Sequence, residues 1–166
     1  LALTRERAPG KGQRFSWLSA IKGSWRLSWP TIGLLCALIA GAWLRFHRLL
    51  ELPADLGWDL PYNYTDTERI LNGEHLIFFT DNYGREGLFF YLAALVAKFM
   101  GLSPYSIRVT SALVGMAAIP AIYLLAHECA DSPTASLAAL GLSLSKWHIV
   151  LSRSGYRVSL MPLFSI

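Results

Sequence analysis

Carboxylates and arginines gather in residues 45–86, which hold eight of the eleven acidic residues and four arginines. This stretch follows an uncharged run that ends at Leu44, and Asp59 lies 15 residues beyond that end. A carboxylate held near a membrane surface can take the proton of a hydroxyl or amine that attacks a lipid-linked substrate. Arginines beside it can hold a departing phosphate. Asp59 has a second interpretation, as a helix N-cap or a plainly solvated acid before Leu60 and Pro61.

The elements that position these side chains follow from the apolar runs of the sequence. Apolar and aromatic residues make up 54% of the chain, charged residues make up 16%, and the mean hydropathy is +0.38. Soluble domains carry about 25% charged residues, so this composition predicts a membrane protein. We expect an all-α polytopic fold with four complete transmembrane helices and part of a fifth, near residues 27–44, 87–107, 109–126, 132–152 and 158–166.

The polar segments predict the orientation in the membrane. Residues 1–26 form a basic arm with six lysines and arginines against one acid, which places the arm in the cytoplasm. The loop 45–86, of net charge −4, is then extracytoplasmic, in an integral protein of the plasma or inner membrane. The arm either lies on an anionic leaflet or is a solvated tail. Within the loop, a capping-box pattern and Gly73 predict a short helix over 66–72.

A first span that ends in Arg45 is followed by five short stretches in a fixed order, at residues 53–59, 66–73, 82–92, 101–109 and 146–157. In this order they resemble the N-terminal module of the GT-C superfamily of membrane glycosyltransferases. The most similar branch is the protein O-mannosyltransferase and aminoarabinose-transferase type. The resemblance covers residues 53–166, so we expect one membrane module over residues 27–166 with the arm 1–26 apart from it.

The resemblance implies inverting transfer of a sugar from a polyprenyl-phosphate donor to an acceptor on the non-cytoplasmic face. Asp59 aligns with the catalytic Asp of the family. Glu86 aligns with an acid that helps to bind a divalent metal ion in some members, and this metal is the one cofactor expected. Arg85, Glu86 and Arg153 are the residues expected to bind the substrate and its phosphate. The expected partners are the lipid bilayer and a lipid-linked sugar, and no nucleic acid.

Two departures from the family pattern leave a second function open. Leu60 stands where the family has a Glu beside the catalytic Asp, and Gly87 stands where it has a Pro. The alternative is therefore a non-catalytic relative that acts as a structural subunit and contacts other membrane subunits. Its docking face would be one of two groups of small residues, unless these pack within the chain: Gly33, Ala37 and Gly41 on the first span, or Ala112, Gly115 and Ala118 on the third.

Two further expectations concern the ends of the sequence and the side of the membrane on which Arg153 lies. The sequence begins without a methionine and stops inside the apolar stretch 158–166, so we expect a piece of a longer protein. Simple alternation of four spans places Arg153 in the cytoplasm, whereas the resemblance places the stretch around it near the outer site. A short or re-entrant helix among the spans would reconcile the two.

Overall fold

The computed structural model describes residues 28–52, 59–81 and 83–166, and the predicted basic arm 1–26 lies outside them. The described part is mostly helical. Its helices are α2 (Trp29–Phe46), α3 (Asp59–Leu71), α4 (Leu88–Met100), α5 (Pro104–Cys129), α6 (Ser132–Leu144), α7 (Lys146–Arg153) and α8 (Leu160–Ser165), with a 3-10 turn η1 (Arg157–Ser159) before α8. Strands β1 (Phe78–Phe79) and β2 (Arg85–Glu86) pair antiparallel.

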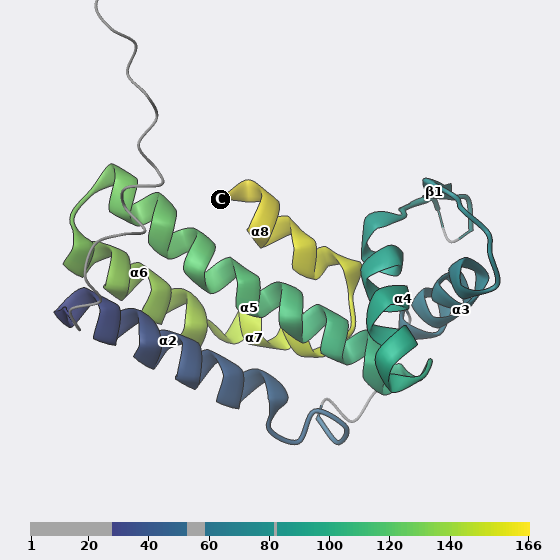
Figure 1. The fold of residues 1–166 in the computed structure, drawn as a ribbon, viewed down its shortest axis with the longest axis horizontal. Coiled ribbons are helices and arrows are strands. Elements are labelled where there is room, and N and C mark those ends of the chain that lie inside the picture. Colours follow the sequence, from purple (N-terminus) through teal and green to yellow (C-terminus); the bar gives the residue numbers. More distant parts are fainter. Residues whose placement is uncertain (1–27, 53–58, 82) are drawn as a thin grey trace, which may run out of the picture.

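Helices α2, α5 and α6 with α7 lie side by side as an elongated bundle (Figure 1). Helix α2 has 18 residues and α5 has 26, and both are long and apolar enough to cross a membrane. At 1.5 Å per residue they extend about 27 Å and about 39 Å, against a hydrocarbon core of about 30 Å. The spans predicted near 27–44 and 109–126 are therefore confirmed as helices of membrane-spanning length.

The other predicted spans are not continuous helices. The run 87–107 is divided at Gly101, so α4 has only 13 residues, about 20 Å. Ser103 then caps a new helix, because its side chain accepts a hydrogen bond from the backbone N–H of Ser106. The run 132–152 is divided at Ser145, where α6 and α7 meet at a bend of 55°. The run 158–166 forms η1 and the six residues of α8. Four complete spans are not found in the described residues. Each of these runs is apolar on average, but the helix within it is interrupted.

Helices α3 and α4 and the β-hairpin form a lobe at one end of the bundle (Figure 1). The predicted loop helix exists, but it begins at Asp59 rather than at residue 66. The Thr65 hydroxyl bonds back to the carbonyl of Pro61 within the helix, at 3.2 Å, instead of capping its start. Gly73, with φ +97°, follows the end of the helix as predicted. The buried apolar core of the lobe consists of Leu60, Ile70, Phe79, Phe89, Phe90, Ala94 and Ile107.

The small-residue stripe of α2 packs within the chain. A Cβ atom on Gly33 would lie 2.8 Å from the Cβ of Ser136 on α6. A Cβ on Gly41 would lie 2.5 Å from the Cδ1 of Ile119 on α5, and Ala37 is fully buried. The face predicted as a docking surface for another polypeptide is therefore covered by this chain's own helices, since only small residues allow such close approach.

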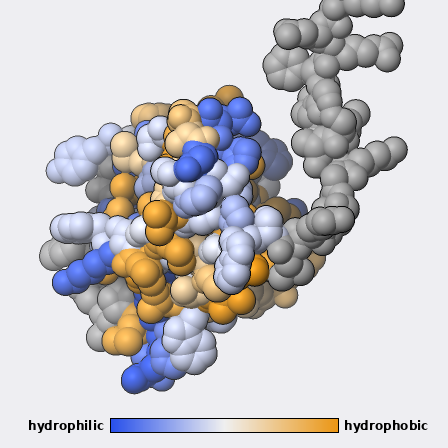
Figure 2. All heavy atoms as spheres, turned by 90° about the vertical axis from the view of Figure 1, so that its left-hand side faces the viewer, coloured by the Kyte–Doolittle hydropathy of each residue, from blue (hydrophilic) through white to orange (hydrophobic). Residues whose placement is uncertain are grey.

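Contacts at the two ends of the bundle show which way its helices run. The Ser136 hydroxyl donates to the carbonyl of Pro30 at the start of α2, at 3.0 Å. Arg153 donates to carbonyls at the end of α2, so α6 and α7 run parallel to α2. Helix α5 runs the other way, because Arg108 near its start donates to Leu49 just beyond α2, at 3.1 Å. Arg153 therefore lies beside the lobe. Figure 2 shows the opposite end, where hydrophilic and apolar side chains both reach the surface.

Candidate functional site

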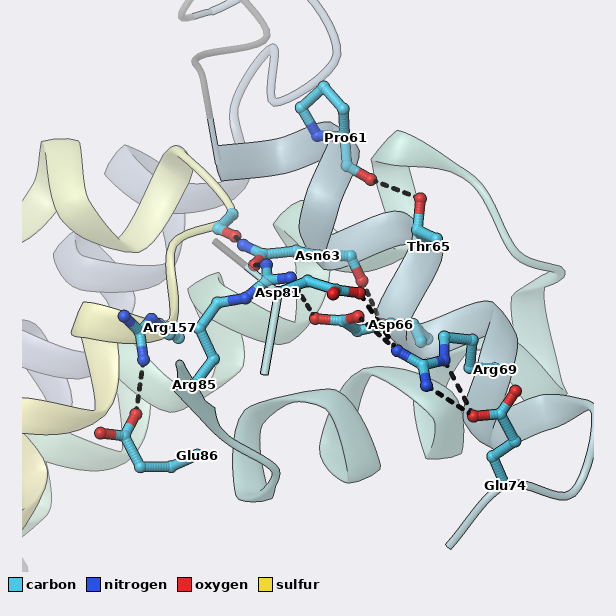
Figure 3. A network of polar contacts seen from close by, with 12 residues as sticks. Pro61, Asn63, Thr65, Asp66, Arg69, Glu74, Asp81, Arg85, Glu86 and Arg157 are labelled. Atoms are coloured by element: carbon cyan, nitrogen blue, oxygen red, sulfur yellow. Dashed lines mark hydrogen bonds and ion pairs between the residues drawn. The ribbon is translucent and has the colours of Figure 1, made fainter. Parts of the chain in front are cut away.

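Arg85 and Glu86 leave strand β2 on opposite sides (Figure 3). Successive side chains of a strand alternate between its two faces. The Arg85 side chain is 2% exposed inside the lobe, whereas the Glu86 side chain is 81% exposed and points toward Arg157. Two residues that the sequence grouped as substrate-binding therefore belong to different networks.

The buried network joins helix α3 to strand β2. Arg85 Nη2 lies 2.5 Å from Asp66 Oδ2, and Arg85 Nη1 donates to Asn63 Oδ1 at 3.4 Å. Burial raises the pKa of Asp66 above its ordinary value, and the positive charges of Arg85 and Arg69 partly offset that rise. The Arg85 guanidinium therefore binds Asp66 and Asn63 inside the lobe and is not exposed to a substrate phosphate.

Asn63 connects this network to the turn that precedes Arg157. Its Nδ2 donates to the carbonyl of Gly155 at 2.9 Å. Gly155 has φ +73°, and a Cβ there would lie 2.7 Å from Leu60 Cδ1, so the turn requires glycine. Leu60 is 2% exposed in the lobe core. An ionised Glu at this position would be buried in apolar surroundings, which gives the departure at Leu60 a packing reason.

Glu86 and Arg157 line a groove between the start of α4 and α8. Arg157 Nη1 donates to Glu86 Oε2 at 2.6 Å (Figure 3). The groove has a volume of about 610 Å³ and is otherwise lined by Leu88, Phe89, Val158, Leu160, Met161, Phe164 and Ser165. A hydrogen bond from its own backbone N–H, and next the Arg157 guanidinium, hold the pKa of Glu86 below its ordinary value. The groove thus combines one charged pair with an apolar lining.

Gly87, the second departure from the family pattern, also has a packing reason. Its N–H donates to the carbonyl of Ile77 at 2.9 Å. A Cβ at this position would lie 2.9 Å from the same oxygen and 3.0 Å from the carbonyl oxygen of Leu76. Proline has no N–H and would bring extra ring atoms into this contact. The packing of the β-hairpin on the start of α4 accounts for glycine here.

The Arg153 side chain caps the C-terminal end of helix α2. The last carbonyls of a helix have no partner within the helix. The guanidinium of Arg153 donates at 2.5–3.2 Å to the carbonyls of Leu44, His47, Arg48 and Leu52. The side chain is therefore held by the backbone, at the end of the bundle where the lobe lies.

Arg45 forms a second buried contact between helices of the bundle, which sequence reasoning missed. It is fully buried and donates to the carbonyls of Gly41, at 3.0 Å, and Ser143, at 3.2 Å. Its Nη2 lies 2.6 Å from His148 Nδ1. The Ser143 carbonyl is available because α6 ends beside Ser145. The signal was present in the sequence, because Arg45 continues the four-residue spacing of the small-residue stripe.

Asp59, the predicted base, is the first residue of α3 and is half-buried. The next residue, Leu60, packs on Gly155, which lies two positions before Arg157. The structure therefore brings the start of α3, Glu86 and Arg153 to the same end of the bundle. Arg157 and Asn63 are the site residues that sequence reasoning did not select. Arg157 lay within the recognised stretch 146–157, whereas nothing marked Asn63.

The predicted metal ion does not fit the residues that the structure describes. Within residues 28–52, 59–81 and 83–166, no three His, Cys, Asp or Glu side chains gather in a group that could hold a metal. Glu86 instead faces the Arg157 guanidinium, whose positive charge disfavours a second cation at that carboxylate.

No protein-family model, no curated protein and no solved structure matches this chain.

Proposed function

We propose that the chain is part of a membrane glycosyltransferase that transfers a sugar from a polyprenyl-phosphate donor to an acceptor on the non-cytoplasmic face. The observation that carries the proposal is the groove between α4 and α8. A polyprenyl phosphate has the same division into a long apolar chain and an anionic head. The apolar lining suits the isoprenoid chain, and Arg157 supplies a charged donor for the phosphate.

The proposed orientation places the arm 1–26 in the cytoplasm and the lobe outside. Helices α2 and α5 and the bent pair α6–α7 are then the spans. Helix α4 does not cross and lies at the outer surface, where its exposed Leu95, Phe99 and Met100 meet lipid. The support for this orientation is the six bases of the arm against the net charge of −4 in the loop 45–86. The groove then lies where lipid head groups meet the hydrocarbon core.

In the proposed reaction, the acceptor oxygen or nitrogen attacks the anomeric carbon of the sugar. The bond from that carbon to the phosphate oxygen breaks, and the phosphate leaves with the electron pair, so the carbon is inverted. Asp59 takes the proton of the acceptor. Arg157 stabilises the charge that develops on the departing phosphate. Arg85 and Arg153 position the lobe and the end of α2.

Asp59→Asn tests the proposed base. The change preserves the size of the side chain and removes its ability to take a proton. Transfer from a panel of radiolabelled polyprenyl-phosphate sugars, in membranes of cells that express the complete gene, should fall about 10²–10⁴-fold. Glu68→Gln, an exposed change on the same helix, is the matched control and should leave transfer unchanged.

Two outcomes would contradict these assignments. Unchanged transfer in Asp59→Asn removes Asp59 from the mechanism. No transfer from any donor of the panel by the unaltered protein counts against the enzyme and favours the structural subunit. The contacts described above favour the enzyme, because Leu60 and Gly87 both have packing reasons and the small-residue stripe is already covered.

A further inference from the structure

We infer that Glu86 competes with the donor phosphate for Arg157: Glu86 holds Arg157 in the resting protein, and the head group of an anionic lipid must take Arg157 from it. The inference rests on the proposed function, because it concerns the same groove. It assigns Glu86 the role of setting the affinity of the groove for anionic lipids.

The first observation is the contrast between the two ion pairs that start from strand β2. The Arg85–Asp66 pair is 2% and 1% exposed at its two side chains, so exchange with a ligand would require the lobe to open. The Arg157–Glu86 pair is 30% and 81% exposed. An ion pair this accessible to water is weak. A second anion can therefore replace the Glu86 carboxylate at low cost.

The second observation is that the two partners are held differently. Arg157 begins η1 directly after the turn that Asn63 and Leu60 hold against the start of α3. The backbone at Arg157 therefore stays beside the groove when its partner leaves, which keeps the guanidinium within reach of a bound phosphate. The Glu86 side chain is mostly in water, and its carboxylate accepts bonds from Arg157 and from its own backbone N–H, so no other residue's packing holds it. It can turn into solvent without breaking any packing.

Removal of the Glu86 charge should therefore strengthen the binding of a lipid phosphate. The free energy that an exposed ion pair contributes corresponds to a factor of up to about five in affinity. We expect Glu86→Gln to bind a lipid phosphate about three- to fivefold more tightly than the unaltered protein. Glu86→Asp retains the charge and should keep the affinity close to that of the unaltered protein.

The experiment measures equilibrium binding of farnesyl phosphate and of farnesol to the protein in phosphatidylcholine nanodiscs. Farnesol reports the apolar lining alone. Arg157→Gln should lose the preference for farnesyl phosphate over farnesol. Glu51→Gln is the matched control, because it removes a carboxylate from another exposed pair, with Arg48, that does not line the groove. It should leave both affinities unchanged.

The outcomes separate this inference from the proposed function. If the unaltered protein prefers farnesyl phosphate but Glu86→Gln binds it equally or more weakly, the inference is overturned and the proposed function stands. If the unaltered protein binds farnesyl phosphate and farnesol equally, the proposed function fails. Displacement of farnesyl phosphate by millimolar inorganic phosphate would show that the site takes free phosphate, which overturns the lipid as the competing anion.

Discussion

Removal of one partner of the Asp66–Arg85 pair should destabilise the lobe more than removal of both. The two charged atoms lie 2.5 Å apart, and the side chains are 1% and 2% exposed. A buried charge without its partner costs about 3–5 kcal/mol, whereas neutral replacement of both partners is often close to neutral. Arg69 remains 3.8 Å from Asp66. We therefore expect about 3 kcal/mol for Arg85→Met, about 4–5 kcal/mol for Asp66→Asn, and less than about 2 kcal/mol for the double variant.

The two single variants should also differ in their response to pH. Burial raises the pKa of Asp66, and loss of Arg85 removes a charge that lowers it, so the pKa rises further in Arg85→Met. A raised pKa means that the folded state binds the proton more tightly than the unfolded state. Arg85→Met should therefore be most stable near and below the ordinary Asp pKa of about 3.9 and lose stability as the pH rises toward 7. Asp66→Asn has no such carboxyl and should lack this change.

The assay is the free energy of unfolding in a titration of dodecyl sulfate into the detergent-solubilised protein, followed by far-ultraviolet circular dichroism at several pH values. Glu68→Gln serves as the exposed control on the same helix. If the cost of the double variant equals the sum of the two single costs, the residues are not coupled and the reasoning fails. Equal pH profiles for the two single variants would refute the assignment of the buried charge.

Other contacts give predictions of their own. Gly87→Pro removes the N–H that donates to Ile77 and should cost about 2–3 kcal/mol in the same titration, whereas Gly87→Ala retains the N–H and should cost about half as much. Arg153→Met removes the guanidinium that donates to the carbonyls of Leu44, His47 and Leu52, at and just beyond the end of α2, and should cost about 2–4 kcal/mol, with partial rescue by Arg153→Lys. A membrane-impermeant thiol reagent should label Tyr83→Cys in intact cells but reach the native, exposed Cys129 only after permeabilisation; the reverse pattern would contradict the proposed orientation.

The sequence predicts the two long spans well because each is an uninterrupted apolar run. It predicts the shorter ones poorly, since hydropathy sums side-chain preferences and does not register where the backbone changes direction. The break after Gly101 had a local signal in the Ser-Pro pair that begins α5. The break at Ser145 also had a signal, because Lys146 interrupts the apolar run directly after it, but a single lysine does not show that the backbone bends by 55° there.

The site residues also divide into those that the sequence indicates and those whose role depends on contacts between distant parts of the chain. Glu86 could be selected from the sequence because it aligns with an acid of the family that the stretch 82–92 resembles. The contacts that give it a role join Glu86 to Arg157 across 71 positions, and Asn63 to Gly155 across 92 positions. The burial of Arg85 and the exposure of Glu86 follow from their alternation on a strand of only two residues. No periodicity can be recognised in so short an element, so the pattern could not separate the buried arginine from the exposed acid.

The position of Arg153 shows why the length of α4 matters for the site. If α4 crossed the membrane, the chain would cross four times before Arg153, which would then lie on the side opposite the lobe. Arg153 instead donates to carbonyls at the end of α2, where the loop toward the lobe begins. Three crossings, by α2, α5 and the bent pair α6–α7, satisfy that contact, and four do not. The short α4, about 20 Å long, therefore allows Arg157 and Glu86 to meet at one surface of the proposed membrane arrangement.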